Sequence, residues 1–334
     1  MRRRMMALLA ALLMGAGSAG AQTETVRIGV SRLASCAPIA IAIAKGYFAA
    51  EKLDPQLSYF DAQQPIAVGV TSGDLDFGIA AETAALYSLT SEGKLRIIAG
   101  GAMEAPTFHY LGILASNQAY AAGLTAPKDI AGHTFALTQR GTGLEYSLGE
   151  IAEKYGFDIK SVRLLPLQGN AMIASALAGG RADSAIFSST GALPLLNKGD
   201  AKLLGWVGDE TGLDQAYLFF TQAAIADGKH DTVERVLRAF KKGARDYHNA
   251  FTDAAGKRAN QASAPEMLGI IAKYVNQPVE VVERGLPYFD ADGRILEKSV
   301  QHQIEWYRAQ GLLKGDVSAA QIIDKRYAVE MAAK

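Results

Sequence analysis

The sequence has few cysteines and histidines and lacks the short motifs by which many enzymes and metal sites are recognised. It contains one cysteine and five scattered histidines, none at HxxxH spacing or beside the cysteine. The single cysteine, Cys36, excludes an intrachain disulfide, so stability must come from packed apolar cores. No Walker, GxGxxG or GxSxG pattern follows a predicted strand. We therefore expect no metal and no other cofactor, and no motif indicates catalysis.

An excess of charge of one sign is also absent. The chain has 34 Lys and Arg residues against 34 Asp and Glu residues. Without the three arginines at its beginning, 31 against 34 remain, a net charge of −3. Such a balance argues against a nucleic-acid partner. Beyond the first 21 residues, no segment is long and apolar enough to suggest a membrane span.

Residues 1–21 have the pattern of a secretory signal peptide. Three arginines precede an apolar run, residues 5–14, that is too short to span a bilayer. Small residues, Ser18 to Ala21, then end the leader, as cleavage requires. We expect cleavage near Ala21 and export to the periplasm; a membrane anchor is the alternative. No cysteine adjoins the cleavage site, so lipid attachment is not expected.

Residues 25–48 predict a strand, a loop and a helix. Val26, Ile28 and Val30 alternate as in a strand, and a polar loop follows. Pro38 suits the first turn of a helix, which should end near Gly46. A helix N-terminus that faces such a loop is the usual ligand corner of an open α/β sheet. This corner predicts a small-molecule site.

Similar patterns continue along the chain. Residues 25–101 alternate strands and helices, as in a parallel sheet covered on both faces. Residues 125–206 repeat the pattern as a second α/β unit, and 217–221 predicts one more strand. From Asp231 onward, helical patterns dominate and are expected to pack on the first unit or to bridge both. With the leader removed, 313 of 334 residues remain, which favours two lobes over one core.

Four segments carry a family resemblance. They are VRIGVSRLASCAPIAIAIAKGYFAAEKLD, VTSGDLDFGIAAE, LTAPKDIAGHTFALTQRGTG and AGGRADSAIFSSTGALPLL. In this order they resemble the extracytoplasmic solute-binding proteins of ABC importers, in the group that binds nitrate, taurine, alkanesulfonate or thiamine pyrimidine. The resemblance implies a type II periplasmic-binding-protein fold with two α/β lobes and a helical C-terminal tail. Lobe I would comprise residues 22–109 plus 207–334, and lobe II residues 110–206, joined by two crossovers that permit hinge closure.

The candidate ligand-binding residues lie mainly in loops between strands and helices, where free backbone N–H groups face a cleft. They are Arg32, Ser35, Cys36, Glu82, Thr83, Glu104, Arg140, Gly141, Thr142, Ser188, Ser189 and Tyr217. The Ser and Thr residues are either ligand contacts or simple helix caps. Cys36 either lines the site or is a small buried hydrophobe.

The charged candidates leave the sign of the ligand open. Arg140, before two glycines, could clamp a carboxylate or sulfonate, or could be a solvated loop residue; Arg32 has the same ambiguity. Glu82 either serves only the helix dipole or faces the ligand. In the second case it would repel an anion and suit an amine or an N–H-bearing ring.

The resemblance implies a binding protein and not an enzyme. Its expected partners are a small polar or anionic organic solute (a sulfonate, carboxylate, aromatic acid or pyrimidine-like molecule) and the membrane subunits of an ABC permease. We expect a monomer and no nucleic-acid partner. The alternatives are an enzyme similar to thiamine-pyrimidine synthase on the same fold, and a binding protein that serves a sensor.

Overall fold

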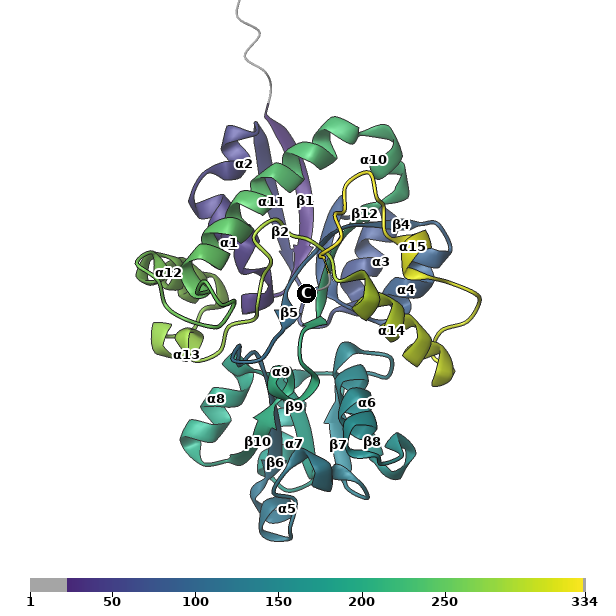
Figure 1. Ribbon diagram of the computed structural model, residues 1–334, viewed down its shortest axis with the longest axis vertical. Helices are drawn as coiled ribbons and strands as arrows, with labels where there is room; N and C mark the ends of the chain where they lie inside the picture. The colour runs from purple at the N-terminus through teal and green to yellow at the C-terminus, as the bar shows by residue number, and fades with distance from the viewer. Residues whose placement is uncertain (1–22, 333–334) are drawn as a thin grey trace, which may run out of the picture.

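Two five-stranded sheets form the centres of two lobes (Figure 1), in a computed structural model that describes residues 23–332. The predicted leader, residues 1–21, lies outside the described residues. The first sheet has the order β2 (Leu53–Tyr59), β1 (Glu24–Val30), β3 (Phe77–Ala81), β12 (Tyr217–Gln222) and β4 (Leu95–Gly100). The second has the order β10 (Ala201–Trp206), β6 (Leu111–Ser116), β9 (Ser184–Ser188), β7 (Thr134–Leu137) and β8 (Arg163–Pro166).

Both sheets are mixed, but the four strands within residues 25–101, predicted to be parallel, do run in one direction; the later strand β12 is the antiparallel one. Strand β1 runs parallel to β2 and β3, but β12 runs antiparallel to β3 and β4. In the second sheet, β6 is antiparallel to β9 and β10, while β7 is parallel to β8 and β9. The reason is topological: β12 reaches the first sheet only after the chain has crossed to the second lobe and returned.

The helices of the first lobe come from both ends of the chain. The early ones are α1 (Ala37–Ala44), α2 (Tyr47–Ala50), α3 (Gln64–Ser72) and α4 (Ala84–Ser91). The later ones are α10 (Ala223–Gly228), α11 (His230–Phe251), α12 (Ala264–Val275), α13 (Val279–Glu283), α14 (Glu297–Ala309) and α15 (Ala319–Ile322). Helix α11 packs on α1 at Gly243, where a Cβ would lie 2.2 Å from the backbone oxygen of Pro38. The first lobe is therefore closed by the C-terminal part of the chain.

The second lobe is continuous in sequence. Its helices are α5 (Asn117–Ala121), α6 (Gly143–Tyr155), α7 (Asn170–Ala178), α8 (Ser189–Lys198) and α9 (Val207–Thr211). The C-terminal helices also reach this lobe. Trp306 of α14 packs against Gly149 of α6, and Tyr146 hydrogen-bonds to His302 over 2.8 Å. Helix α14 therefore contacts both lobes.

The chain crosses between the lobes through two very short strands. Strand β5 (Met103–Glu104) pairs antiparallel with β11 (Asp214–Gln215), so that Asp214 lies opposite Glu104. Met103 also pairs with Tyr288 of the C-terminal segment. Two-residue strands carry no readable periodicity, which is why the sequence did not predict them.

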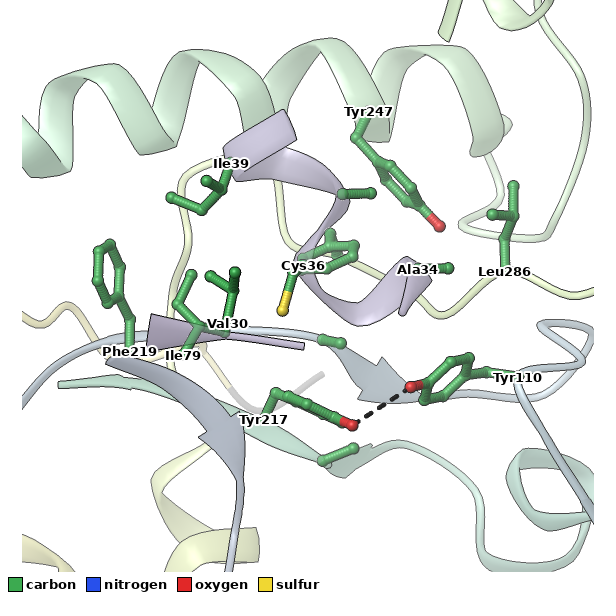
Figure 2. Packing of buried hydrophobic residues seen from close by; sticks show 14 of the residues in the cluster. Val30, Ala34, Cys36, Ile39, Ile79, Tyr110, Tyr217, Phe219, Tyr247 and Leu286 are labelled. Atoms are coloured by element: carbon green, nitrogen blue, oxygen red, sulfur yellow. Dashed lines mark hydrogen bonds between the residues drawn. The ribbon is translucent and has the colours of Figure 1, made fainter. Parts of the chain in front are cut away.

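The core of the first lobe lies between its sheet and α1 (Figure 2). Val30, Ile79 and Phe219 of the sheet face Ile39 of α1, and all four are buried. Near the junction of the lobes, the hydroxyl groups of Tyr110 and Tyr217 lie 3.4 Å apart. Across residues 23–332, no helix combines the length and the apolar character that a membrane span needs.

Candidate functional site

A cavity of about 80 Å³ lies between the lobes, at the ends of the strands. It adjoins β5 (Met103–Glu104) and β11 (Asp214–Gln215), which connect the lobes and are called the hinge strands below. The first lobe and the hinge contribute Leu33, Asp61, Ala62, Gln63, Gln64, Ala81, Glu82, Thr83, Glu104, Asp214, Ala216 and Tyr217. The second lobe and its entry contribute Tyr110, Leu111, Thr138, Gln139, Thr142, Gly143, Leu144, Ser147, Asn170, Ile186, Phe187 and Ser188. This is the position that the strand–loop–helix corners predicted.

The lobes touch each other around this cavity. The backbone N–H of Ala84 donates to the carbonyl oxygen of Gly141 over 3.0 Å, and Thr83 and Thr142 form a β-bridge. At another contact, the hydroxyl of Ser189 donates to the carbonyl oxygen of Gly285 over 2.6 Å. Direct hydrogen bonds therefore join the two lobes beside the cavity.

Three buried carboxyl groups dominate the polar lining. Glu82 follows β3, while Glu104 and Asp214 face each other across the hinge strands. Directly opposed residues of an antiparallel pair project to the same face, so these two side chains are neighbours. Their exposed fractions are 3% for Glu82, 1% for Glu104 and 6% for Asp214. The site thus collects acidic groups that lie far apart in the sequence.

Burial and mutual repulsion raise the pKa of these acids. Burial raises the pKa of Glu82 well above its usual value, and the charge of Asp214 adds to this. The same two causes, burial first, raise the pKa of Glu104. Burial raises the pKa of Asp214 to about 7, although hydrogen bonds from Ser299 and Gln303 favour its charged form. Ionising all three without a counter-charge is therefore unfavourable.

Several carboxyl oxygens have no hydrogen-bond partner within the described residues. At the cavity they are Oε2 of Glu82 and both carboxyl oxygens of Glu104, and outside the lining Oε2 of Glu150. The N–H groups of Leu111 and Gly208 lie near enough to Glu104 to favour its charged form, so Glu82 Oε2 is the oxygen with the least support from the protein. Glu82 Oε1 reaches toward the second lobe, where a Cβ at Gly143 would lie 2.6 Å from it. Buried acceptors without partners are costly, so this part of the lining has the greatest need of a hydrogen-bond donor.

The second lobe offers hydroxyl, amide and apolar groups. Thr142 begins α6 without capping it; its hydroxyl donates to the carbonyl oxygen of Gln139 over 3.2 Å. The hydroxyls of Ser188 and Thr190 lie 3.2 Å apart. Thr83, in contrast, is a helix cap and accepts from the N–H of Leu86 over 3.0 Å. The hydroxyls of Thr142 and Ser188 have no capping role.

Half of the candidate residues line the cavity: Glu82, Thr83, Glu104, Thr142, Ser188 and Tyr217. The others lie outside the lining and have partners elsewhere or are buried. Arg32 stacks on the Tyr59 ring at 3.7 Å, and Arg140 pairs with Glu145 at 2.7 Å. Ser35 and Cys36 are buried. The N–H of Gly141 donates to Glu145, and the hydroxyl of Ser189 donates to Gly285.

Cys36 is a fully buried core residue in the helical turn Ala34–Cys36 (Figure 2). Burial raises the pKa of its thiol, and its sulfur lies 3.7 Å from the hydroxyl of Ser31. A neutral, buried thiol is a poor nucleophile. This residue therefore contributes packing to the loop that follows β1.

Sequence reasoning did not single out several lining residues, chiefly Asp214, Ser147 and Asn170. Asp214 lies between the second predicted α/β unit and the strand predicted at 217–221, and only the pairing of β11 with β5 places it beside Glu104. No sequence pattern marked the inward-facing positions of α6. For α7, the position of Asn170 at the start of a helix, directly after a strand and a short loop, could have identified it as a candidate.

A family described as NMT1/THI5 like matches residues 34–254, about two thirds of the chain. The chain belongs to the NMT1/THI5-like family. The match includes every lining residue of the cavity except Leu33. None of the curated proteins compared with the chain matches it.

Solved structures similar to this NMT1/THI5-like chain share its two-lobed fold. One is the ligand-binding component of an ABC-type import system from Staphylococcus aureus with zinc bound (TM-score 0.72, 12% identity, 91% of this chain and 97% of that one). Another is the alkanesulfonate-binding protein SsuA from Xanthomonas axonopodis pv. citri bound to MOPS (TM-score 0.71, 18% identity, 91% of this chain and 99% of that one). A third is the periplasmic nitrate-binding protein NrtA from Synechocystis (TM-score 0.67, 15% identity, 91% of this chain and 86% of that one). The predicted periplasmic-binding-protein fold is confirmed.

Proposed function

We propose that this protein is the extracytoplasmic solute-binding component of an ABC importer. One observation carries the proposal: a cavity lies between two lobes that are joined by paired two-residue strands and touch through direct hydrogen bonds. A small solute would be captured by hinge closure and delivered to the membrane subunits of a permease. The protein is proposed to act as a monomer in the periplasm.

The composition of the lining supports binding without turnover. Among the described lining residues there is no cysteine, histidine or lysine, and Cys36 is buried elsewhere. An enzyme similar to thiamine-pyrimidine synthase would need a lysine to hold its cofactor, and none lies at this cavity. Family membership and the similar binding-protein structures add support.

The test combines binding with a measurement of shape. The purified mature protein is titrated with a small-solute library in a thermal-shift assay, because a ligand that binds only the folded state raises Tm. Small-angle X-ray scattering with and without the best ligand should show a smaller radius of gyration when it is bound. Mass spectrometry should recover the ligand unchanged. Absence of any ligand, or formation of a product, contradicts the proposal.

A further inference from the structure

The interlobe cavity has an uneven charge. Four acidic residues line it, Asp61, Glu82, Glu104 and Asp214, and none of the described lining residues is Lys, Arg or His. The two arginines that favoured an anionic ligand, Arg32 and Arg140, lie outside the lining and contact Tyr59 and Glu145 instead. A sulfonate or carboxylate would therefore meet buried acids with no cationic side chain to offset them.

From this arrangement we infer that the solute is an organic cation whose charged nitrogen carries N–H groups, such as an ammonium or an amidinium. The inference rests on the proposed binding function and specifies its substrate class. A buried carboxyl oxygen without a partner needs a donor, and a charged N–H donor satisfies both the hydrogen bond and the charge. Quaternary ammonium ions have no N–H and would leave these oxygens unpaired.

The placement of the acids explains how such a cation would be held. Glu104 and Asp214 sit side by side on the two hinge strands, and Glu82 reaches toward Gly143 of the second lobe. A cation among them would reduce the mutual repulsion of the three carboxylates. The rest of the lining, including Leu111, Leu144 and Phe187, would face the apolar part of the solute.

A metal ion is a weaker candidate for the same charge. Among residues 23–332, no three His, Cys, Asp or Glu side chains are arranged to hold one. Asp214 is already bonded to Ser299, and Glu82 reaches across to Gly143. The separated oxygens match several N–H donors on one organic molecule better than a single coordination centre.

Binding should also move protons. The groups that face Glu82 from the packed elements are Asp214, Glu104, Glu150, Tyr87, Tyr146, Tyr307 and Tyr217. None of these is cationic, and burial raises the pKa of each acid among them. A cation would favour the ionised carboxylates, so binding should release protons and strengthen as pH rises from 5 to 8. An anion held by protonated acids would show the opposite sign.

The experiment uses pairs of probes that differ in charge but share a shape. The full mature protein is tested by thermal shift with guanidinium against nitrate and acetamidinium against acetate, each at 10 mM, and with tetramethylammonium. A polar metabolite extract is then separated on cation and anion exchangers, and each fraction is tested. We expect stabilisation by the N–H cations and by the cation fraction only.

Calorimetry in two buffers of different ionisation enthalpy measures the protons released by the most stabilising cation. Glu82→Gln should weaken that cation at least tenfold, whereas Glu280→Gln, which removes an exposed carboxyl of α13, should change its affinity less than twofold. Circular dichroism checks that both variants fold. If Glu82→Gln does not fold, Asp214→Asn replaces it in the comparison.

The outcomes separate this inference from the proposed function. The cation inference is overturned if an anion or the anion fraction stabilises the protein, or if binding takes up protons. It is also overturned if tetramethylammonium stabilises as strongly as the N–H cations. In each of these cases the protein is still a binding protein. An unchanged affinity in the folded carboxyl variant also overturns the cation inference. If no probe and no fraction binds, the proposed function fails, and the inference fails with it.

Discussion

The two sides of the cavity are built from different chemistry. The first lobe and the hinge provide buried carboxyl groups at Glu82, Glu104 and Asp214, whereas the second lobe provides hydroxyls, two amides and apolar side chains. Acidic charge is therefore concentrated on the first lobe and the hinge strands, whereas the second lobe offers uncharged hydrogen-bonding groups. The difference suggests a division of roles: the hinge side selects the charge of the solute, and the second lobe selects its shape.

Removing one polar group from each side tests this division most strongly. Asp214→Asn should weaken the most stabilising cation about thirtyfold, because a charged partner is lost at a buried site. Thr142→Val, which removes a hydroxyl of the second lobe, should weaken it no more than about fivefold. Isothermal titration calorimetry at pH 7.5 measures both affinities. Equal losses on the two sides would contradict the division.

Forcing the lobes apart should have the next largest effect. A Cβ at Gly285 would lie 1.9 Å from the Cβ of Ser189, so Gly285→Ala should push α8 away from the C-terminal segment. A ligand that needs the closed form would then bind about tenfold more weakly, since fewer molecules are competent to bind.

Gly269→Ala is the matched control, because a Cβ at this α12 position meets no atom within 4 Å. Its ligand affinity should equal that of the wild type, and scattering should show an unchanged shape. A wild-type affinity for Gly285→Ala would mean that closure at this contact is not needed.

The acidic side should also reveal itself through pH when no ligand is bound. Asp214 has a raised pKa of about 7, so between pH 4 and 7 the folded protein holds a proton that the unfolded chain has lost. Its contribution to the free energy of unfolding therefore falls as pH rises through this range and stays low above it.

Thermal unfolding at pH 5, 6, 7 and 8 checks this sign. From pH 5 to pH 8, wild-type Tm should fall by a few degrees more than that of Asp214→Asn, which lacks the titrating group. Parallel Tm profiles for the two proteins would show that Asp214 does not carry the pH dependence.

The smallest effect is expected at Arg140. Its guanidinium pairs with the buried carboxyl of Glu145 and lies outside the cavity lining. Arg140→Gln should weaken the cation less than threefold and lower Tm by a few degrees at most, because Glu145 keeps its hydrogen bond from the N–H of Gly141. A strong loss of binding would place charge recognition on the second lobe and reverse the comparison.

Much of the fold could be predicted from local patterns. The alternation at Val26, Ile28 and Val30 and the proline at the start of α1 gave the first strand and helix, because both signals depend on neighbouring residues. The direction of β12 could not be read in this way, since direction depends on where the chain re-enters the sheet. The hinge strands were too short to produce a pattern.

The position of the cavity could be predicted, but the directions of the side chains around it could not. The corner before α6 was expected to be a ligand loop, and Thr142 and Gly143 line the cavity. The side chain of Arg140, in the same loop, pairs with Glu145 in the first turn of α6. Both outcomes satisfy the same spacing of residues, so the sequence could not separate them.

Local patterns in the sequence were enough to predict the longer strands and helices, two α/β lobes and the resemblance to solute-binding proteins, because periodicity and motif order are properties of neighbouring residues. The charge of the cavity, in contrast, follows from the tertiary fold. Glu82, Glu104 and Asp214 meet because two separate crossings of the chain pair at the hinge, beside the end of β3. Which charges face one cavity depends on those long-range pairings, and no local pattern encodes them.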